Sequence, residues 1–350
     1  MNHRNSPLES LKTGNWFKSI CGASFNHLPA VRNLSLAYTI AGVDCIDVSA
    51  DPAVIAAAKE GMQAAGDRPL PWLMASLNDG EDPHFRKAQF DPDRCPVDCP
   101  RPCEAVCPAI AINASGVIDS RCYGCGRCLP ICPYGYITTR SYVTAPEVVV
   151  PMLLSQGIDA IEIHTQVGRL ADFQRLWRVI QPGLNRLKLI SISCPDDADL
   201  IPYLRSLYDL MSPLPIPLIW QTDGRPMSGD IGKGSTIAAI KLAAKVLNAN
   251  LPGYVQLAGG TNDRTVPKLG EMGLLAASGS PAFVAGVAYG SYARKLLLPT
   301  LDRLENAVSN TDFPSPSAMR LENYPDLLQQ ATQQARTLVS QLKHQCSSKN

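Results

Sequence analysis

The chain has 350 residues, and its 32 Lys and Arg residues against 31 Asp and Glu residues give a formal net charge of +1. This balance gives no electrostatic reason to expect nucleic acid or an anionic membrane as a partner. Hydrophobic residues make up 45% of the chain, enough for a sizeable core. No run of 18 apolar residues is present to span a bilayer, and the first 20 residues lack the apolar segment of a signal peptide, so we expect a cytoplasmic protein.

Short apolar runs alternate with helical patterns at the start of the chain. The first three runs, which we expect to be strands, cover residues 16–24, 44–50 and 70–77. Apolar residues at helical spacing follow the first two strands, and Asp51 should cap the second of these helices. The first 14 residues, like the polar C-terminal SSKN, are expected to be mobile. Alternating strands and helices are typical of a parallel sheet with helical crossovers.

A cysteine-rich block interrupts this alternation at residues 91–135, "DPDRCPVDCPRPCEAVCPAIAINASGVIDSRCYGCGRCLPICPYG". Its second half has the spacing C-x2-C-x2-C-x3-C-P, which is the ligand pattern of bacterial ferredoxins. These cysteines are Cys122, Cys125, Cys128 and Cys132. In the first half the cysteines stand four apart and again end before a proline. They are Cys95, Cys99, Cys103 and Cys107.

In two-cluster ferredoxins the last cysteine of each run binds the cluster of the other run. We therefore predict that each cluster takes three ligands from one run and one from the other. Cluster A, a 4Fe-4S cluster, would be held by Cys107, Cys122, Cys125 and Cys128. Cluster B, either 4Fe-4S or 3Fe-4S, would be held by Cys95, Cys99, Cys103 and Cys132.

Zinc and disulfides are the rival interpretations of the same block. Zinc favours two separated C-x2-C pairs, and disulfides need an oxidising compartment. Both fit this spacing less well than iron–sulfur clusters do. The segment between the two runs, residues 109–120, suits a short hairpin with its turn at residues 113–116.

After the block the alternation resumes with a helix over residues 144–157. Five further strands are then expected, at residues 158–165, 187–194, 216–223, 253–260 and 282–290. Eight strand–helix units predict a (β/α)8 barrel with the cysteine block inserted after the third strand, on the face where barrel active sites lie. An open doubly wound sheet is the main alternative.

Three domains follow from this interpretation. Residues 16–89 and 141–310 would form the barrel-like domain, and residues 90–140 the ferredoxin-like module. Residues 311–350 would form a helical extension, in which a mostly polar helix over residues 325–345 is expected to lie on the outside.

Glycines and a basic residue follow the last two predicted strands. Loops in these places form phosphate cradles in many barrels, so we considered a phosphate or FMN site there. The residues are Gly259, Gly260, Gly290, Ser291 and Arg294. The glycines are equally expected if they only make tight turns.

Catalytic residues are not assigned by the sequence. Glu162 and His164 stand two apart on one predicted strand, so both would point into the barrel, either as a general acid/base or as part of a polar layer at its mouth. Cys194, at the end of another strand, lacks a neighbour that would activate a thiol.

The cysteine motif, set between "PWLMASLNDG" and "GIDAIEIHTQVGRL", resembles the light-dependent period (LdpA) family of cyanobacteria. The resemblance implies an iron–sulfur protein that feeds redox state, and through it light intensity, into the circadian clock. It also implies clock input and oscillator proteins as partners. A redox pool such as quinone or ferredoxin would exchange electrons with the clusters.

Two functions follow from these observations. The first is a redox sensor without enzyme activity, whose clusters take part in electron transfer and change a protein-binding surface. The second is a flavin-type (β/α)8 oxidoreductase fed by its own ferredoxin insert.

Overall fold

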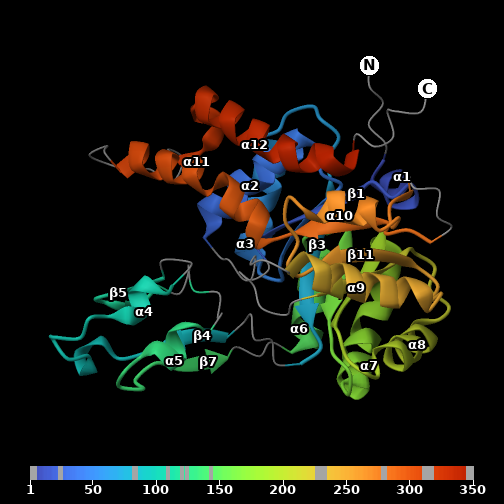
Figure 1. Ribbon diagram of the computed structural model, residues 1–350, viewed down its shortest axis with the longest axis horizontal. Helices are drawn as coiled ribbons and strands as arrows, with labels where there is room; N and C mark the ends of the chain where they lie inside the picture. Colours follow the sequence, from blue (N-terminus) through green and yellow to red (C-terminus); the bar gives the residue numbers. More distant parts are fainter. Residues whose placement is uncertain are drawn as a thin grey trace.

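The computed structural model describes residues 6–22, 27–80, 86–107, 111–118, 122, 126–141, 145–224, 235–276, 282–309 and 319–343. Its largest part is a closed barrel of eight parallel strands (Figure 1). In chain order these are β1 (Trp16–Gly22), β2 (Cys45–Ser49), β3 (Trp72–Asn78), β8 (Ala160–His164), β9 (Leu189–Pro195), β10 (Leu218–Asp223), β11 (Tyr254–Ala258) and β12 (Gly286–Tyr289). The first strand pairs with both β2 and β12, which closes the sheet. The predicted barrel is confirmed, and the open sheet is wrong.

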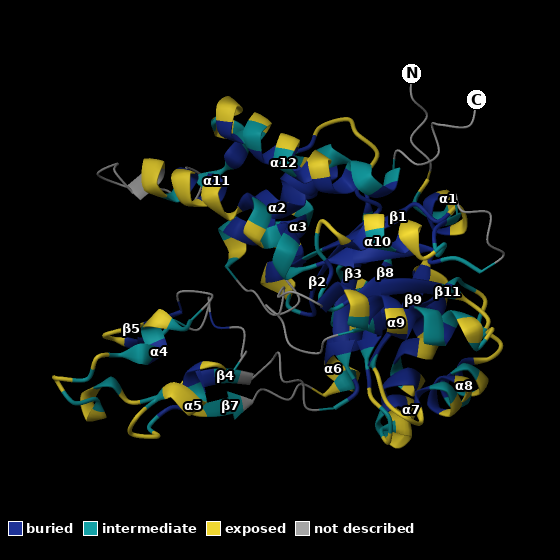
Figure 2. Ribbon diagram, viewed as in Figure 1, coloured by how far each residue is buried: buried dark blue, intermediate teal, exposed yellow. Residues whose placement is uncertain are grey.

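Helices surround the barrel and bury the outward faces of its strands. They are α2 (Leu28–Ala41), α3 (Pro52–Gln63), α6 (Pro146–Ser155), α7 (Leu170–Ile180), α8 (Leu200–Met211), α9 (Ser235–Asn248), α10 (Thr265–Glu271) and α11 (Ser291–Ser309). Asp51 caps α3 as expected, since its Oδ1 accepts a hydrogen bond from the Ala53 amide at 2.8 Å. Figure 2 shows the strands buried and the outer helix faces exposed.

The N-terminal end of the barrel is closed by residues that we had expected to be mobile. Helix α1 (Pro7–Lys12) is capped by Ser6, and Leu11 is fully buried in a cluster that includes Trp16 and Ile219. The prediction for the first 14 residues is therefore wrong over α1. The Leu11 side chain shields the N-terminal end of the barrel from water. The burial of this apolar side chain stabilises the position of α1.

The C-terminal helix α12 (Pro325–Lys343) lies outside the barrel, as expected, and packs against α2 and α11. Most residues of α12 are polar, but one stripe of the helix is apolar, and its Leu338 and Leu342 are almost fully buried. At the end of the helix, Lys343 forms an ion pair with Asp44. Among the described residues no helix is both long and apolar enough to cross a bilayer.

The cysteine-rich segment leaves the barrel after β3 and returns before α6. Two strands, β4 (Arg86–Gln89) and β7 (Thr138–Ser141), pair antiparallel at its base. Beyond them lie a short 3-10 helix (Pro92–Arg94), α4 (Pro102–Ala105), the predicted hairpin of β5 (Ile112–Asn113) and β6 (Gly116–Val117), and α5 (Cys128–Ile131). We propose that the inserted module begins and ends at the β4–β7 pair, close to the boundaries predicted from the sequence.

The first prediction is that the barrel folds without the module. Gln89 and Thr138 are partners across the β4–β7 pair, so a short Gly-rich turn replacing residues 90–137 should close the hairpin. Shortening a loop changes closure entropy only slowly, so we expect the free energy of unfolding of the barrel to stay within about 2 kcal/mol of the full chain. Urea unfolding followed by circular dichroism measures it. Loss of the cooperative transition would contradict the insertion.

Candidate functional site

Thiols from both cysteine runs meet in the inserted segment. Partial burial raises the pKa of Cys95, and the charges of Cys99 and Cys132 raise it further. Burial also raises the pKa of Cys103, again with a contribution from the charge of Cys132. Cys103 also lies in a small apolar core against which Cys132 packs. The structure therefore brings Cys132, the last cysteine of the second run, near Cys103 of the first run.

Backbone groups near the Cys132 thiol affect its ionisation. Burial alone would raise its pKa, but the backbone of the residues that follow, Tyr134 first, outweighs this and lowers the pKa below the usual value for a thiol. The Gly135 amide itself donates to the Cys132 carbonyl oxygen at 3.1 Å. A lowered pKa favours the thiolate, which is the form that binds iron.

Cysteines of both runs, Cys103 and Cys132 included, share this small apolar core. Cys122 and Cys128 are 8% and 7% exposed and pack with Ala88 and Ile112, while Cys107 is partly buried against this core. The amide of Ala88 donates a hydrogen bond to Cys122 Sγ at 3.4 Å. Cys107 Sγ likewise accepts one from the Ala111 amide at 3.2 Å. Cys125 lies outside the described residues.

The donor set suits an iron–sulfur cluster. All the cysteines that the structure describes are free thiols, with none paired in a disulfide. Among the same residues, no three His, Cys, Asp or Glu side chains are close enough to hold a single metal ion. Several thiols share an apolar core and accept backbone N–H bonds, as the ligands of clusters do. The assignment of individual ligands to clusters A and B remains a proposal.

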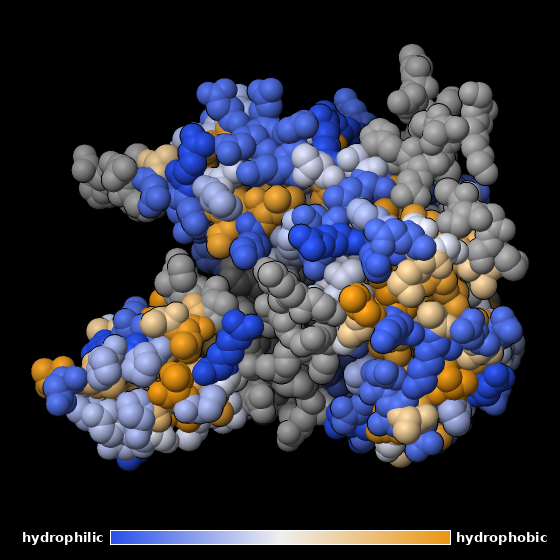
Figure 3. All heavy atoms as spheres, viewed as in Figure 1, coloured by the Kyte–Doolittle hydropathy of each residue, from blue (hydrophilic) through white to orange (hydrophobic). Residues whose placement is uncertain are grey.

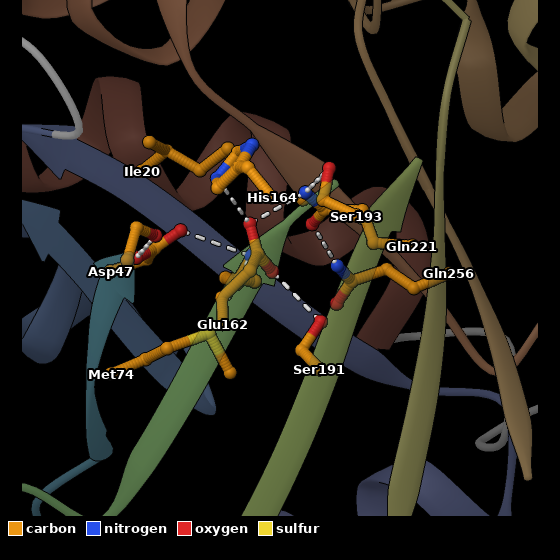
Figure 4. Close-up of polar contacts among 12 residues, drawn as sticks. Ile20, Asp47, Met74, Glu162, His164, Ser191, Ser193, Gln221 and Gln256 are labelled. Atoms are coloured by element: carbon orange, nitrogen blue, oxygen red, sulfur yellow. Dashed lines mark hydrogen bonds and ion pairs between the residues drawn. The ribbon is translucent and has the colours of Figure 1, made fainter. Parts of the chain in front are cut away.

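A network of buried charges occupies the interior of the barrel (Figure 4). The Lys18 ammonium from β1 is fully buried and forms ion pairs with Asp47 of β2, at 3.0 Å, and with Glu162 of β8. Glu162 also accepts hydrogen bonds from Ser191 at 2.8 Å and from Gln221 at 2.7 Å. These contacts tie five different strands together.

The charges in this network fix each other's protonation. Burial alone would lower the pKa of Lys18, but the two carboxylates raise it well above the usual value. Burial would raise the pKa of Glu162, but Lys18 and His164 hold it below its ordinary range, whereas for Asp47 burial prevails and raises the pKa. A lysine held protonated in this way is not a nucleophile.

The two candidate catalytic residues do come together. His164 Nε2 lies 3.2 Å from Glu162 Oε1, and the two side chains point toward one another in Figure 4. The His164 side chain is 22% exposed, while those of Glu162 and Lys18 are at most 1% exposed. His164 is therefore the member of this cluster at the open end. Both expectations, a polar layer and an acid/base pair, fit this geometry, and an acid/base role stays a prediction.

The residues of the predicted phosphate site follow β11 and β12, at the C-terminal ends of these strands. Gly259 and Gly260 have φ of 64° and 92°, and a side chain at Gly260 would lie 2.8 Å from Ser235 Cβ. Close packing against α9 therefore accounts for Gly260 without a ligand. Arg294 donates hydrogen bonds to Ser291 Oγ at 3.3 Å and to the carbonyl oxygen of Ile20 at 3.4 Å. Gly290 directly precedes α11, and FMN binding here stays a prediction.

Cys194 has the environment of an inert thiol. It is 3% exposed at the end of β9, and burial raises its pKa to about 12. A thiol with so high a pKa is scarcely ionised at neutral pH and reacts slowly.

Sequence reasoning did not single out most of the barrel interior. Lys18, Gln221 and Gln256 are buried polar residues on β1, β10 and β11. The available signal was a polar residue at an inward position within a strongly apolar strand, as in "WFKSI" and "LIWQTD". Recognising it required knowing which face of each strand lies inside the barrel.

Two family models match the chain. Residues 95–143 match the LdpA Fe-S cluster-binding domain, and residues 152–341 match the Light dependent period A C-terminal domain. Over 340 residues the chain is 53% identical to a protein named Light dependent period A from Synechococcus elongatus, covering 96% of this chain and 94% of that protein. The chain belongs to the LdpA family.

The family resemblance of the cysteine motif is thereby confirmed, and the cofactor of this LdpA-family chain is of the iron–sulfur class. Solved structures are also similar over 96% of this chain and 97% of theirs. One is 2-keto-3-deoxy-6-phospho-gluconate aldolase from Zymomonas mobilis, at 9% identity and a TM-score of 0.42. Another is tryptophan synthase subunit alpha from Legionella pneumophila, at 11% and 0.44. These scores add nothing to the strand pairing, which establishes the barrel.

The second prediction concerns the buried lysine of the LdpA-family barrel. Lys18→Met leaves two buried carboxylates without their cation, so we expect the free energy of unfolding to fall by about 3–5 kcal/mol. Lys245→Met is the matched control, because Lys245 pairs with Asp196 at the surface and should cost at most about 1 kcal/mol. Urea unfolding measures both, and equal losses would refute a structural role for Lys18.

The third prediction tests the crossing of ligands. Cys132→Ser should perturb the cluster of Cys95, Cys99 and Cys103, and Cys107→Ser the cluster of the second run, because the two-cluster ferredoxin pattern assigns each thiol to the opposite run. Electron paramagnetic resonance of reduced protein distinguishes the two signals. Cys194→Ser should leave both unchanged. If each substitution instead altered the cluster of its own run, the crossed arrangement would be wrong.

Proposed function

We propose that this protein is a redox sensor that relays the redox and light state of the cell to the circadian clock by redox-dependent protein binding. The observation that carries the proposal is the packing of Cys132 against the small core that contains Cys103, which supports the two-cluster ferredoxin arrangement because it joins the two cysteine runs. A relative whose name refers to a light-dependent period supports the link to the clock.

The thiols of both runs would hold two clusters. Cys107, Cys122, Cys125 and Cys128 are the proposed ligands of cluster A, and Cys95, Cys99, Cys103 and Cys132 those of cluster B. Bound clusters supply reversible one-electron transfer. The residues around them hold the thiols, donate N–H bonds to sulfur and limit access of water.

Cluster B would be the point of electron exchange with a redox pool, such as quinone or ferredoxin. Cys95, Cys99 and Cys132 are partly exposed, whereas Cys122 and Cys128 are buried. Val97, Ile131 and Tyr134 expose apolar surface in the same region. Apolar side chains lie among polar ones on this part of the molecule in Figure 3, which suits a short-lived contact with an electron carrier.

The barrel would supply the binding surface rather than a reaction. Within its interior, Lys18 and Glu162 are satisfied by one another and by their neighbours, so neither is available to a substrate. One observation favours the alternative of a flavin-dependent oxidoreductase: Gly259, Gly260 and Ser291 stand at the C-terminal ends of the adjacent strands β11 and β12.

The fourth prediction separates these functions. Clock input and oscillator proteins are titrated against the anaerobic full-length protein in its oxidised and its reduced state. We expect affinities that differ at least severalfold, because the charge of the clusters differs between the two states. The variant Cys107→Ser/Cys132→Ser should lose that difference.

Equal affinities in both states would contradict the sensor. The same protein is titrated with FMN, and saturable binding that Arg294→Gln weakens would support the oxidoreductase instead. The two titrations use different ligands, so the sensor hypothesis and the oxidoreductase hypothesis are tested independently.

A further inference from the structure

Two basic residues stand directly opposite each other at the base of the inserted segment. In the antiparallel pairing of β4 and β7, Lys87 is the partner of Arg140, and Ala88 is the partner of Thr139. Ala88 is 4% exposed and faces the small core that contains Cys122. Side chains alternate along a strand, so Lys87 and Arg140 lie side by side on the opposite face of the hairpin.

This arrangement is unfavourable for the hairpin by itself. Like charges directly opposite one another destabilise an antiparallel pair. Both side chains are also partly buried, which weakens their hydration. Burial and the charge of Arg140 accordingly lower the pKa of Lys87. Two cations held together in this way call for negative charge nearby.

A proposed ligand of cluster A lies close to the pair. The Ala88 amide lies 3.4 Å from Cys122 Sγ, so the Cα of Lys87, one peptide bond away, is within about 6 Å of that sulfur. The cationic pair Lys87–Arg140 therefore stands next to a proposed ligand of cluster A.

We propose that the cationic pair Lys87–Arg140 raises the reduction potential of cluster A and leaves cluster B unaffected. This inference rests on the proposed function, because it assumes a cluster at Cys122. It assigns to two residues the setting of the potential at which a sensor would respond.

The physical reason is the charge of the added electron. A nearby cation stabilises the reduced, more negative form, and a unit charge about 10 Å away at an effective dielectric constant of about 20 changes the ratio of reduced to oxidised cluster about tenfold. For a one-electron couple, tenfold corresponds to about 59 mV. By linkage, reduction of cluster A must in turn strengthen its attraction to the cationic pair.

Cluster B has a different basic neighbour, which provides a matched control. Arg94 directly precedes Cys95, and its guanidinium lies 4.7 Å above the ring of Tyr136. Arg94→Gln removes the same charge from the same module. It should therefore lower the potential of cluster B and not that of cluster A.

The test is a potentiometric titration of full-length protein followed by electron paramagnetic resonance. At a fixed potential near the midpoint, Lys87→Gln and Arg140→Gln should each reduce the ratio of reduced to oxidised cluster A about tenfold, with cluster B unchanged. Lys87→Arg keeps the charge and should keep the wild-type potential. An unchanged cluster A in both Gln variants, or equal shifts in both clusters, would overturn the inference.

Iron content is measured for each variant to show that its clusters are present. If a variant loses its cluster, the salt dependence of the cluster potentials in wild-type protein tests the inference instead. Salt screens the partly buried pair, so high ionic strength should lower the potential of cluster A more than that of cluster B. Equal salt dependence would count against the cationic pair. Wild-type protein without clusters would refute the proposed function itself. Clusters whose reduction potentials do not depend on these charges would refute only this inference.

Discussion

The parallel pairing of β3 with β8 is the constraint on which the architecture depends. These strands are neighbours in the barrel, with Asn78 opposite His164, and the Asp79 amide continues the ladder by donating to the His164 carbonyl oxygen at 3.1 Å. The whole inserted segment therefore has to leave and re-enter the barrel over one strand-to-strand connection. The β4–β7 pair meets this requirement, because it holds the outgoing and returning chains together.

The inserted segment depends on its cysteines for more than electron transfer. Its core is small and consists largely of thiols and short apolar side chains such as Ala88, Ala111 and Ile112. Domains of this size seldom bury enough apolar surface to be stable alone and are commonly held by metals or disulfides. Bound clusters would thus contribute to folding, and their oxidation state would act directly on the structure that carries them.

The barrel and the module also differ in how their charges are arranged. Inside the barrel, Lys18 lies between Asp47 and Glu162, and this closed set of ion pairs fixes strands to one another. At the base of the module, Lys87 and Arg140 are like charges opposite each other in an antiparallel pair. The first arrangement favours a rigid body, and the proposed role of the second is to respond to the charge of a bound cluster.

The barrel was predictable because each strand is an apolar run between helical patterns, and Asp51 marks the start of α3. Helix α1 was missed, since "PLESLK" has little apolar content and is held by the burial of Leu11 and by contacts with distant residues, such as that of Ser10 with Lys343. The β4–β7 pair was missed for a similar reason: "RKAQ" and "TTRS" are polar, and only their pairing across the module makes them strands. The contacts of Lys18 depend on barrel closure, which no local pattern encodes.

The most direct test of the account is the metal content and Mössbauer spectrum of anaerobically purified full-length protein. Two clusters with crossed ligands require about eight iron atoms per chain, or about seven if cluster B is of the three-iron type, in the quadrupole doublets of cluster iron. Stoichiometric zinc with iron near zero, or iron sufficient for only one cluster, would contradict it.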